Sequence, residues 1–380
     1  MMDRKLHIAL SIMAIHGILV ANAQAKICAN KSFRNQPIER LQVANDEKLY
    51  IPIVVHVVYQ NDEQNISSDQ IKSQIKVIND DFNAQNANYG STVDEFSEIK
   101  TKADIAFYLS SPIGLDLDEI GVIRVSTGHS AFVNQDIHYS ELGGSDAIEP
   151  ESHLNIWVTD LGGEVYGYSQ SYPDYTIGES GIVIDYQYFG TVGTAQSPYD
   201  GGRTLTHEIG HFLGLAHPWG VEVCADGDGI SDTPEQDGPI YQCDLEWNSC
   251  GTLAATQNFM NLAPDACMTF FTAGQVSYMR SVLLSQKSDL VHERPVLGTR
   301  LTKQPRIYPV PAKDHFFING SKSEYSLRIW DSNGIEVPFQ TERSIGNEFR
   351  IIPTKRIAGL YIVQLEHDGL VFREKMILKN

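Results

Sequence analysis

The chain has 380 residues and a mass of 42.3 kDa, enough for about two domains at the usual ~150 residues each. Hydrophobic residues make up 42% and charged residues 20% of the sequence, which excludes a mainly disordered chain. The 48 Asp and Glu residues outnumber the 29 Lys and Arg residues, and the net charge of −19 disfavours nucleic-acid binding because phosphates would be repelled.

The N-terminus has the pattern of a secretory signal peptide. Arg4 and Lys5 precede an apolar run over residues 6–20, and the small residues of the Ala21–Ala23 segment follow. Residues 1–23 are therefore assigned to a signal peptide that is cleaved after Ala23. The alternative, a transmembrane anchor, is disfavoured because the run is short for a bilayer and no other stretch approaches ~18 apolar residues. We expect a secreted protein with no transmembrane segment in the mature chain.

Residues 24–49 are polar and weakly patterned, as expected for a propeptide or N-terminal arm. This arm contains Cys28, and the other four cysteines cluster at positions 224, 243, 250 and 267. Four clustered cysteines in an exported chain most simply form two disulfides, for which three connectivities exist, and Cys28 is left over.

The segment after the arm predicts a twisted sheet backed by a helix. Residues 50–59 form a β-branched run typical of a buried strand, in which His56 is interpreted as a core histidine rather than a ligand. Ser67 begins a predicted capping box before an apolar stripe at helical spacing that ends at Phe82. Further strands are expected at residues 105–109, 121–125, 154–158 and 181–186, and a helix capped by Thr272 at residues 273–290. This order favours an α+β fold.

The stretch Thr204–His217 carries the chemistry. On a helix, His207 and His211 lie one turn apart on one face, so both imidazoles reach a single ion. Gly214 ends the helix and allows His217 to return as a third ligand. Three imidazoles suit zinc and leave a fourth position for water, from which Glu208 takes a proton. The alternative is a helix with buried histidines or a purely structural zinc.

These residues resemble the metzincin metallopeptidases, and among them the pappalysin and cytophagalysin group. The resemblance covers residues 51–290 and includes the segments 155–158, 181–184 and 201–206 and the Met-turn Asn258–Asn261. It implies a metzincin catalytic domain over residues 50–291, with a twisted mixed sheet, a backing helix and an active-site helix. It also implies that Met260 lies beneath the zinc as a hydrophobic floor.

The sequence departs from the family at two positions. A Tyr usually follows two residues after the Met and helps to stabilise the tetrahedral intermediate, but Leu262 stands here. The usual aspartate after the Met is replaced by Asn261. Stabilisation of the oxyanion must then come from the zinc or another group, and a lower turnover is expected.

The resemblance also bears on the acidic segment 224–235 and on the cysteines. It implies a structural calcium ion near Asp228, Asp232 and Thr233, where the alternative is a solvated acidic loop. It favours interlaced disulfides Cys224–Cys250 and Cys243–Cys267 over sequential ones. It further suggests that Cys28 is the zinc ligand of a latent zymogen, where the alternative is a spare thiol.

A second module is predicted near the C-terminus, because residues 301–380 carry a net charge of +3 whereas residues 1–300 carry −22. After a linker at residues 292–306, strand-like runs at 316–318, 325–330, 349–352 and 360–365 predict a small all-β sandwich over residues 307–380. The Tyr308–Pro311 start and the 359–363 segment resemble the sorting domain of Bacteroidetes type IX secretion substrates. The resemblance implies secretion machinery as a partner, and the alternative is an immunoglobulin-like adhesion domain.

Together these observations predict a secreted or cell-surface zinc metalloendopeptidase that cleaves protein or peptide substrates. The peptide is expected to add to the edge of the sheet. The alternative function is a non-catalytic adhesin that retains a zinc scaffold.

Overall fold

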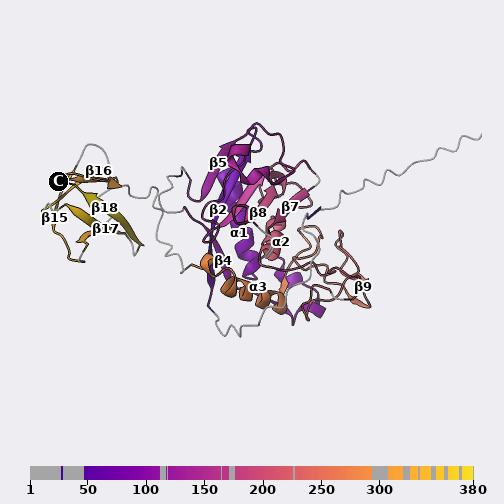
Figure 1. The fold of residues 1–380 in the computed structure, drawn as a ribbon. Coiled ribbons are helices and arrows are strands. Elements are labelled where there is room, and N and C mark those ends of the chain that lie inside the picture. Colours follow the sequence, from indigo (N-terminus) through magenta and orange to yellow (C-terminus); the bar gives the residue numbers. More distant parts are fainter. Residues whose placement is uncertain are drawn as a thin grey trace, which may run out of the picture. The chain divides into compact units, whose positions relative to one another are not determined.

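The structure is a computed structural model, and it divides the chain into two compact units, residues 1–293 and 294–380, which are described separately (Figure 1). The described residues are 27–28, 47–111, 117, 119–163, 165–170, 176–225, 227–292, 307–319, 326–332, 334–343, 348–354, 358–367 and 370–379. The expected signal peptide, most of the N-terminal arm and the linker after His292 lie outside them.

A mixed seven-stranded sheet forms the centre of the first unit. Its order is β1-β7-β8-β6-β2-β4, and β5 pairs with the second half of β2. All neighbours are parallel except β7, which runs antiparallel to β8. The strands are β1 (Ile27–Cys28), β2 (Leu49–Tyr59), β4 (Ile105–Leu109), β5 (Val122–Ser126), β6 (Leu154–Thr159), β7 (Val165–Ser169) and β8 (Ile182–Asp185).

Two helices cover one face of this sheet, as Figure 1 shows for α1 (Ser68–Phe82) and α2 (Arg203–Phe212). Alternate residues of β2 and β6 contribute to the apolar core on this face, and Ile71, Ile78 and Phe82 of α1 are fully buried against it. Ser67 caps α1 by accepting from the Gln70 N–H. The helix expected from the apolar stripe is therefore confirmed.

The prediction of a complete capping box is wrong, because the Gln70 side chain does not bond back to the backbone N–H of Ser67. The Gln70 side chain leaves the helix end and donates to the Phe189 carbonyl (2.8 Å) and the Thr194 hydroxyl (2.8 Å). One turn later, Gln74 donates to the Gly202 carbonyl (2.9 Å). The buried amides of α1 thus hold the loop that leads into α2, which places the second helix on the sheet.

His56 faces the opposite side of the sheet and is a satisfied core histidine, as expected. It is fully buried, and its ring nitrogens lie 2.8 Å from the Ser145 hydroxyl and 2.9 Å from the Asn155 amide oxygen. Its ring stacks on Trp157. Burial lowers the pKa of His56 to about 4, so the ring is neutral in this core.

The helix α3 (Ala273–Ser285) follows a complete capping box between Thr272 and Gln275. The prediction of a helix to residue 290 was too long: α3 ends at Ser285, and a separate 3-10 turn covers the Ser288–Leu290 segment. The remaining strands of this unit are β3 (Lys100–Thr101), β9 (Asn248–Ser249), β10 (Thr252–Leu253) and β11 (Phe271–Thr272). Other 3-10 turns span Tyr89–Ser91, Asp94–Phe96, Gln135–His138, Ser140–Leu142, Ile177–Glu179 and Tyr186–Tyr188.

The second unit consists of two antiparallel sheets around one apolar core, which confirms the predicted small β-sandwich. One sheet has the order β12-β13-β16-β15 and the other β14-β17-β18. The strands are β12 (Ile307–Tyr308), β13 (Phe316–Asn319), β14 (Ser326–Asp331), β15 (Phe339–Arg343), β16 (Glu348–Pro353), β17 (Gly359–His367) and β18 (Leu370–Leu378). Of these, β12, β15 and β18 were not expected from the sequence.

The five strands predicted for the first unit all form, with ends that shift by one residue at most. The edge strand β1 and its neighbour β7 were missed. Within the described residues, no helix combines the length and the apolar character needed to cross a bilayer.

Candidate zinc site

The helix α2 that carries the first two histidines begins without a local side-chain cap. Gly202 occupies the N-cap position with a left-handed φ of 74°. Instead, a carboxylate oxygen of the distant Asp265 accepts from the N–H groups of Gly201 (2.9 Å) and Arg203 (3.0 Å). A carboxylate at this end also complements the helix dipole. The segment after the Met-turn therefore fixes the start of the zinc helix.

A buried ion pair ties the same helix to α1. The Arg203 guanidinium lies 3.3 Å from a carboxylate oxygen of Asp81, and the Thr206 hydroxyl donates to the other oxygen (2.7 Å). Burial raises the pKa of Asp81 to about 6, although Arg203 opposes the shift. These contacts position α2 without the help of a bound metal ion.

The side chains of His207, His211 and His217 converge on one point. The Nε2 atom of His211 is 2.9 Å from that of His207 and 3.0 Å from that of His217, and the third pair is 3.3 Å apart. Nitrogens bound at ~2.0–2.1 Å to a tetrahedral zinc lie about 3.3 Å from one another. The set therefore fits a zinc ion, with a small expansion on binding.

The opposite nitrogens of the first two rings are held by backbone carbonyls. His207 Nδ1 lies 2.8 Å from the Phe259 carbonyl, and His211 Nδ1 lies 2.7 Å from the Leu215 carbonyl. Each Nδ1 must donate to its carbonyl, which leaves the lone pair of Nε2 facing the shared point. This is the tautomer that a metal site requires.

Gly214 ends the helix as the sequence predicted, with φ at 88°. The N–H groups of Gly214 and Leu215 bond back to the carbonyls of His211 (2.8 Å) and Gly210 (2.9 Å). The chain turns there and returns His217. The His217 ring stacks on Trp219, with centroids 4.2 Å apart and planes at 9°, which orients the third imidazole.

Met260 is fully buried under the zinc helix. A Cβ atom at Gly210 would lie 2.3 Å from the Met260 sulfur, so a glycine is needed for this close packing. The side chain of Asn258 shapes the turn by accepting from the Met260 N–H (2.9 Å) and pairing with the Gln275 amide (2.8 and 3.1 Å). The structure thus places the Met-turn against the helix that carries His207 and His211.

Glu208 is also fully buried and lies beside β7. A Cβ at Gly167 in β7 would come within 3.2 Å of the Glu208 Cγ atom, so the glycine leaves room for the carboxylate. At the departures from the family, Leu262 is buried, and Asn261 accepts from the Ile240 N–H (3.0 Å) and donates to Gln236 (3.2 Å). Asn261 therefore has a structural role.

Cys28 lies at the three histidines. Its Sγ atom and the three imidazole nitrogens all lie within 4.8 Å of one another. Strand β1 holds it there by pairing in parallel with β7, so that Cys28 is opposite Gly167. Among the described residues, this is the one group of three or more His, Cys, Asp and Glu side chains whose ligand atoms lie close enough to share an ion.

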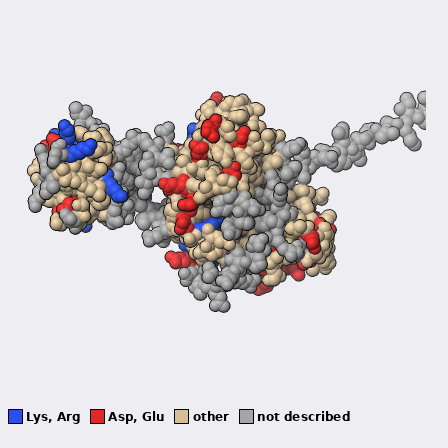
Figure 2. All heavy atoms as spheres, viewed as in Figure 1, with Lys and Arg blue, Asp and Glu red and all other residues tan. Residues whose placement is uncertain are grey.

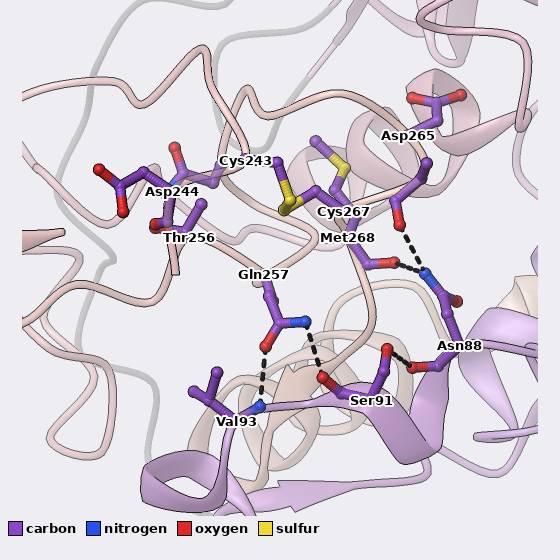
Figure 3. Close-up of a disulfide and its surroundings, with 12 residues drawn as sticks. Asn88, Ser91, Val93, Cys243, Asp244, Thr256, Gln257, Asp265, Cys267 and Met268 are labelled. Carbon is purple, nitrogen blue, oxygen red and sulfur yellow. Dashed lines mark hydrogen bonds between the residues drawn. A yellow bond between two sulfur atoms is a disulfide. The ribbon is translucent and has the colours of Figure 1, made fainter. Parts of the chain in front are cut away.

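Two interlaced disulfides, Cys224–Cys250 and Cys243–Cys267, brace the long segment after the zinc helix. They are the pairs implied by the family resemblance. Figure 3 shows how amides join the second bridge region to residues 88–93: Asn88 donates to the carbonyls of Ala266 (3.1 Å) and Met268 (2.9 Å). The bridge and the amides together fix Asp265, which caps α2.

Of the three residues expected near calcium, Asp228 and Thr233 differ from Asp232 in their hydrogen bonds. Asp228 is buried, and one of its oxygens accepts from the Ile230 N–H (2.8 Å). The other oxygen and the Thr233 hydroxyl have no hydrogen-bond partner among the described residues. Asp232 accepts from the Thr272 hydroxyl (2.8 Å) and the Gly274 N–H (2.7 Å), and so stabilises the start of α3.

Comparison with known proteins assigns the family. The family model described as pregnancy-associated plasma protein-A matches residues 144–284. Mature mirolysin of Tannerella forsythia, solved in complex with a cleaved peptide, is 38% identical with a TM-score of 0.62; the match covers 65% of this chain and 97% of that one. The chain belongs to the pappalysin family of metzincin zinc metallopeptidases.

Other proteins similar to this chain are also metalloproteases. A promirolysin variant of T. forsythia is 39% identical with a TM-score of 0.61, and the match covers 65% of this chain and 84% of that one. An extracellular metalloprotease of Arthroderma benhamiae is 29% identical over 60% of this chain and 74% of its own length. Extracellular metalloprotease 1 of Coccidioides posadasii is 40% identical over 24% of this chain, and the match spans about a third of that protein.

The second unit has its own match. The model of the secretion system C-terminal sorting domain covers residues 306–379. Together with the extracellular relatives, it identifies this pappalysin-family protein as secreted or attached to the cell surface.

Sequence reasoning missed several residues that build this site. Asp265 and Asp81 act over large sequence separations, and no local pattern marks them. Gly167 and Trp219 carried weak signals: a glycine between tyrosines in a short strand-like run, and an aromatic residue two positions after His217. Only the three-dimensional packing shows what these residues contact.

Proposed function

We propose that this pappalysin-family chain is a secreted zinc metalloendopeptidase. The convergence of three Nε2 atoms beside the buried Glu208 carries the proposal. When bound, zinc would polarise a peptide carbonyl and lower the pKa of a water molecule. Glu208 would act as the general base that takes a proton from the attacking water and as the general acid that delivers it to the leaving amine. His207, His211 and His217 hold the metal, and Met260 packs beneath them.

The substrate strand adds to the sheet at β7. In the unprocessed chain β1 pairs in parallel with β7, so removal of the N-terminal arm would free the same backbone groups for an extended segment. Since Gly167 of β7 lies against Glu208, a peptide on this edge passes the catalytic carboxylate. The geometry therefore favours an extended peptide as the substrate.

The test is cleavage of casein or gelatin by the processed protein. Glu208→Ala should lose at least about a thousandfold in kcat/KM because the proton acceptor is gone. Its zinc content should stay at one ion per chain, and the exposed control Glu141→Ala should retain full activity. If the wild type and Glu208→Ala were equally inactive while both held zinc, the adhesin alternative would replace the enzyme.

We further propose that Cys28 keeps the unprocessed chain latent. Its sulfur lies at the three imidazoles, where a thiolate would fill the fourth position of the zinc and exclude the catalytic water. The unprocessed Cys28→Ala protein should then cleave casein, whereas the unprocessed wild type should not. Equal activities before processing would show that Cys28 is a spare thiol.

We also propose a structural calcium ion at Asp228 and Thr233, with Asp232 beside them. The buried oxygens without hydrogen-bond partners among the described residues support this site, as does a calcium preference for oxygen ligands. Calcium chelation should lower the Tm of the wild type by several degrees. The Asp228→Asn protein should show little response, and the exposed control Asp200→Asn should respond as the wild type does. An unchanged wild-type Tm would refute the site.

A further inference from the structure

The two disulfides of the first unit differ in how easily a thiol can reach them. In the Cys224–Cys250 pair, here called the outer bridge, Cys224 is exposed and Cys250 is half-buried. In the Cys243–Cys267 pair, here called the inner bridge and drawn in Figure 3, Cys243 is exposed but Cys267 is buried. Attack at Cys243 would therefore release a thiolate at a buried position, where a charged sulfur is poorly solvated, which slows the exchange.

The backbone at both ends of the outer bridge is strained. Cys224 has a φ of 52° and Cys250 a φ of 50°, in the left-handed region that residues with a Cβ atom rarely adopt. Neither Cys243 nor Cys267 has a positive φ. A strained conformation persists only where the surroundings impose it, and here the bridge links the two strained residues. Opening the outer bridge would relieve this strain, whereas opening the inner bridge would relieve none of this kind.

The segment that the outer bridge ties down follows the third histidine of the site. The N–H of Gly220 donates to the His217 carbonyl (3.0 Å), and Gly220 turns the chain with φ at 58°. Beyond this turn, Val221 and Val223 are 60% and 69% exposed, so apolar packing holds residues 221–224 only weakly. The covalent bond of the outer bridge therefore limits the movement of a segment adjacent to a proposed zinc ligand.

The charge of the surrounding sequence narrows the reductant that could open such a bridge. Residues 214–272 contain nine Asp and Glu residues and no Lys or Arg, and both bridges lie within this range. This acidic surrounding repels a negatively charged thiol such as glutathione, but it does not repel a neutral or positively charged thiol. Small thiols without a net negative charge should therefore react fastest.

We propose that the outer bridge is a redox switch for the zinc site, opened by a neutral or positively charged small thiol. Two thiol molecules are oxidised to one disulfide, and the sulfurs of Cys224 and Cys250 take up the two electrons and two protons as free thiols. Opening releases residues 221–224 and lowers the affinity of the three histidines for zinc, while the inner bridge stays closed. The effect on zinc rests on the proposed function, but the selective opening does not.

The test is a cysteamine titration of the full chain carrying Glu208→Ala and Cys28→Ala, which removes self-cleavage and the thiol of the arm. Iodoacetamide traps the free thiols, and peptide mass spectrometry assigns them. The outer bridge should open at a thiol concentration about tenfold below that needed for the inner bridge, and cysteamine should open it faster than glutathione. After desalting, chelator competition should show a zinc Kd several-fold higher for the opened protein than for the oxidised protein.

A second protein that also carries Cys224→Ser and Cys250→Ser should show the raised zinc Kd without any thiol, and mild thiol should not change it further; the titration decides alone if this protein does not fold. Iodoacetamide without thiol is the control and should leave the zinc Kd unchanged. Simultaneous opening of both bridges, equal rates with glutathione, or an unchanged zinc Kd after the outer bridge opens would overturn the proposal. Failure of the proposed function would appear differently, as an oxidised protein that binds no zinc.

Discussion

Two parts of the first unit are stabilised in different ways: residues 49–213, here called the regular half, and residues 214–272, here called the irregular half. Residues 49–213 contain the strands β2 to β8, the helices α1 and α2, and no cysteine. In the described part of residues 214–272, regular structure is limited to the short strands β9, β10 and β11, and both disulfides lie there. Yet both halves bury their central residues, including Ile53 in the first and Met260 in the second.

The difference shows how a chain satisfies its backbone when secondary structure is scarce. In the first half, sheet and helix ladders pair the N–H and C=O groups. In the second half, side chains do much of this work: Asn258, Asn261 and Gln257 all bond to backbone groups from buried positions. The irregular half therefore depends on particular amides, carboxylates and cysteines, whereas the regular half depends on apolar burial.

The two halves also share an acidic surface. Figure 2 shows Asp and Glu side chains spread over the visible face of the first unit, with few Lys or Arg side chains among them. The acidic side chains behind the net charge of −22 for residues 1–300 are spread over this face rather than gathered in one patch. Such a surface favours solubility and discourages polyanions.

The largest effect expected is the loss of a disulfide from the irregular half. Replacing Cys243 and Cys267 by Ala opens a loop of 24-residue separation, which should cost about 3 kcal/mol of unfolding free energy. Because Cys267 lies two residues from Asp265, zinc affinity should fall as well. Denaturant unfolding and zinc titration measure both quantities.

The wild type treated with reductant is the matched comparison for this double variant. Both should lose stability, and the reduced wild type should lose more because its Cys224–Cys250 bridge is broken as well. A double variant as stable as the oxidised wild type would show that hydrogen bonds alone hold this half together.

The next prediction concerns the regular half, where the buried His56 should make the free energy of unfolding depend on pH. The pKa of His56 falls from 6.5 to about 4 in the folded protein, so the unfolded chain binds the extra proton more readily. Stability must therefore decrease as the pH falls from 6.5 towards 4, by about 3 kcal/mol from this group. In a His56→Gln protein that part of the acid sensitivity should disappear.

Unfolding free energies at pH 7, 5.5 and 4.5 measure this slope. The exposed His129→Gln protein is the control and should keep the slope of the wild type. An identical acid sensitivity in the His56→Gln protein would mean that other groups carry the pH dependence of this half.

A smaller loss of stability is expected from a substitution at Gly210, where the regular half contacts Met260 of the irregular half. An added Cβ would lie 2.3 Å from the sulfur, so Gly210→Ala should destabilise the protein by about 1–3 kcal/mol and displace the Met-turn. Since the Phe259 carbonyl holds His207, zinc affinity should decrease in parallel. Thermal unfolding with and without zinc separates these effects.

Gly178→Ala provides the matched control, because a Cβ there meets nothing within 4 Å. That variant should unfold like the wild type. A Gly210→Ala protein with unchanged stability and zinc affinity would show that the Met-turn adjusts without strain.

The comparison of the halves also explains what the sequence could predict. Strands β2, β6 and β8 are buried on both faces and follow from short continuous apolar runs. Helix α1 follows from the apolar stripe on its buried face. The three histidines proposed to hold zinc follow from helical spacing and from Gly214. Strand β7 was missed although it is as long as β4 and β5, because Gly167 and Ser169 interrupt its apolar pattern. Asp265 and Gln257 were not identifiable, because their partners lie 62 and 164 residues away.

The smallest effect should come from one of these long-range amides. Gln257 is 4% exposed, accepts from the Val93 N–H (2.9 Å) and donates to the Ser91 carbonyl (3.1 Å), as Figure 3 shows. Gln257→Ala leaves two backbone groups unpaired and should cost about 1 kcal/mol. The exposed amide of Gln135 is the control, and its replacement by Ala should change stability by less than about 0.5 kcal/mol. If both amides were equally dispensable, side-chain hydrogen bonds would not explain how the irregular half keeps its shape, and the disulfides alone would have to hold it.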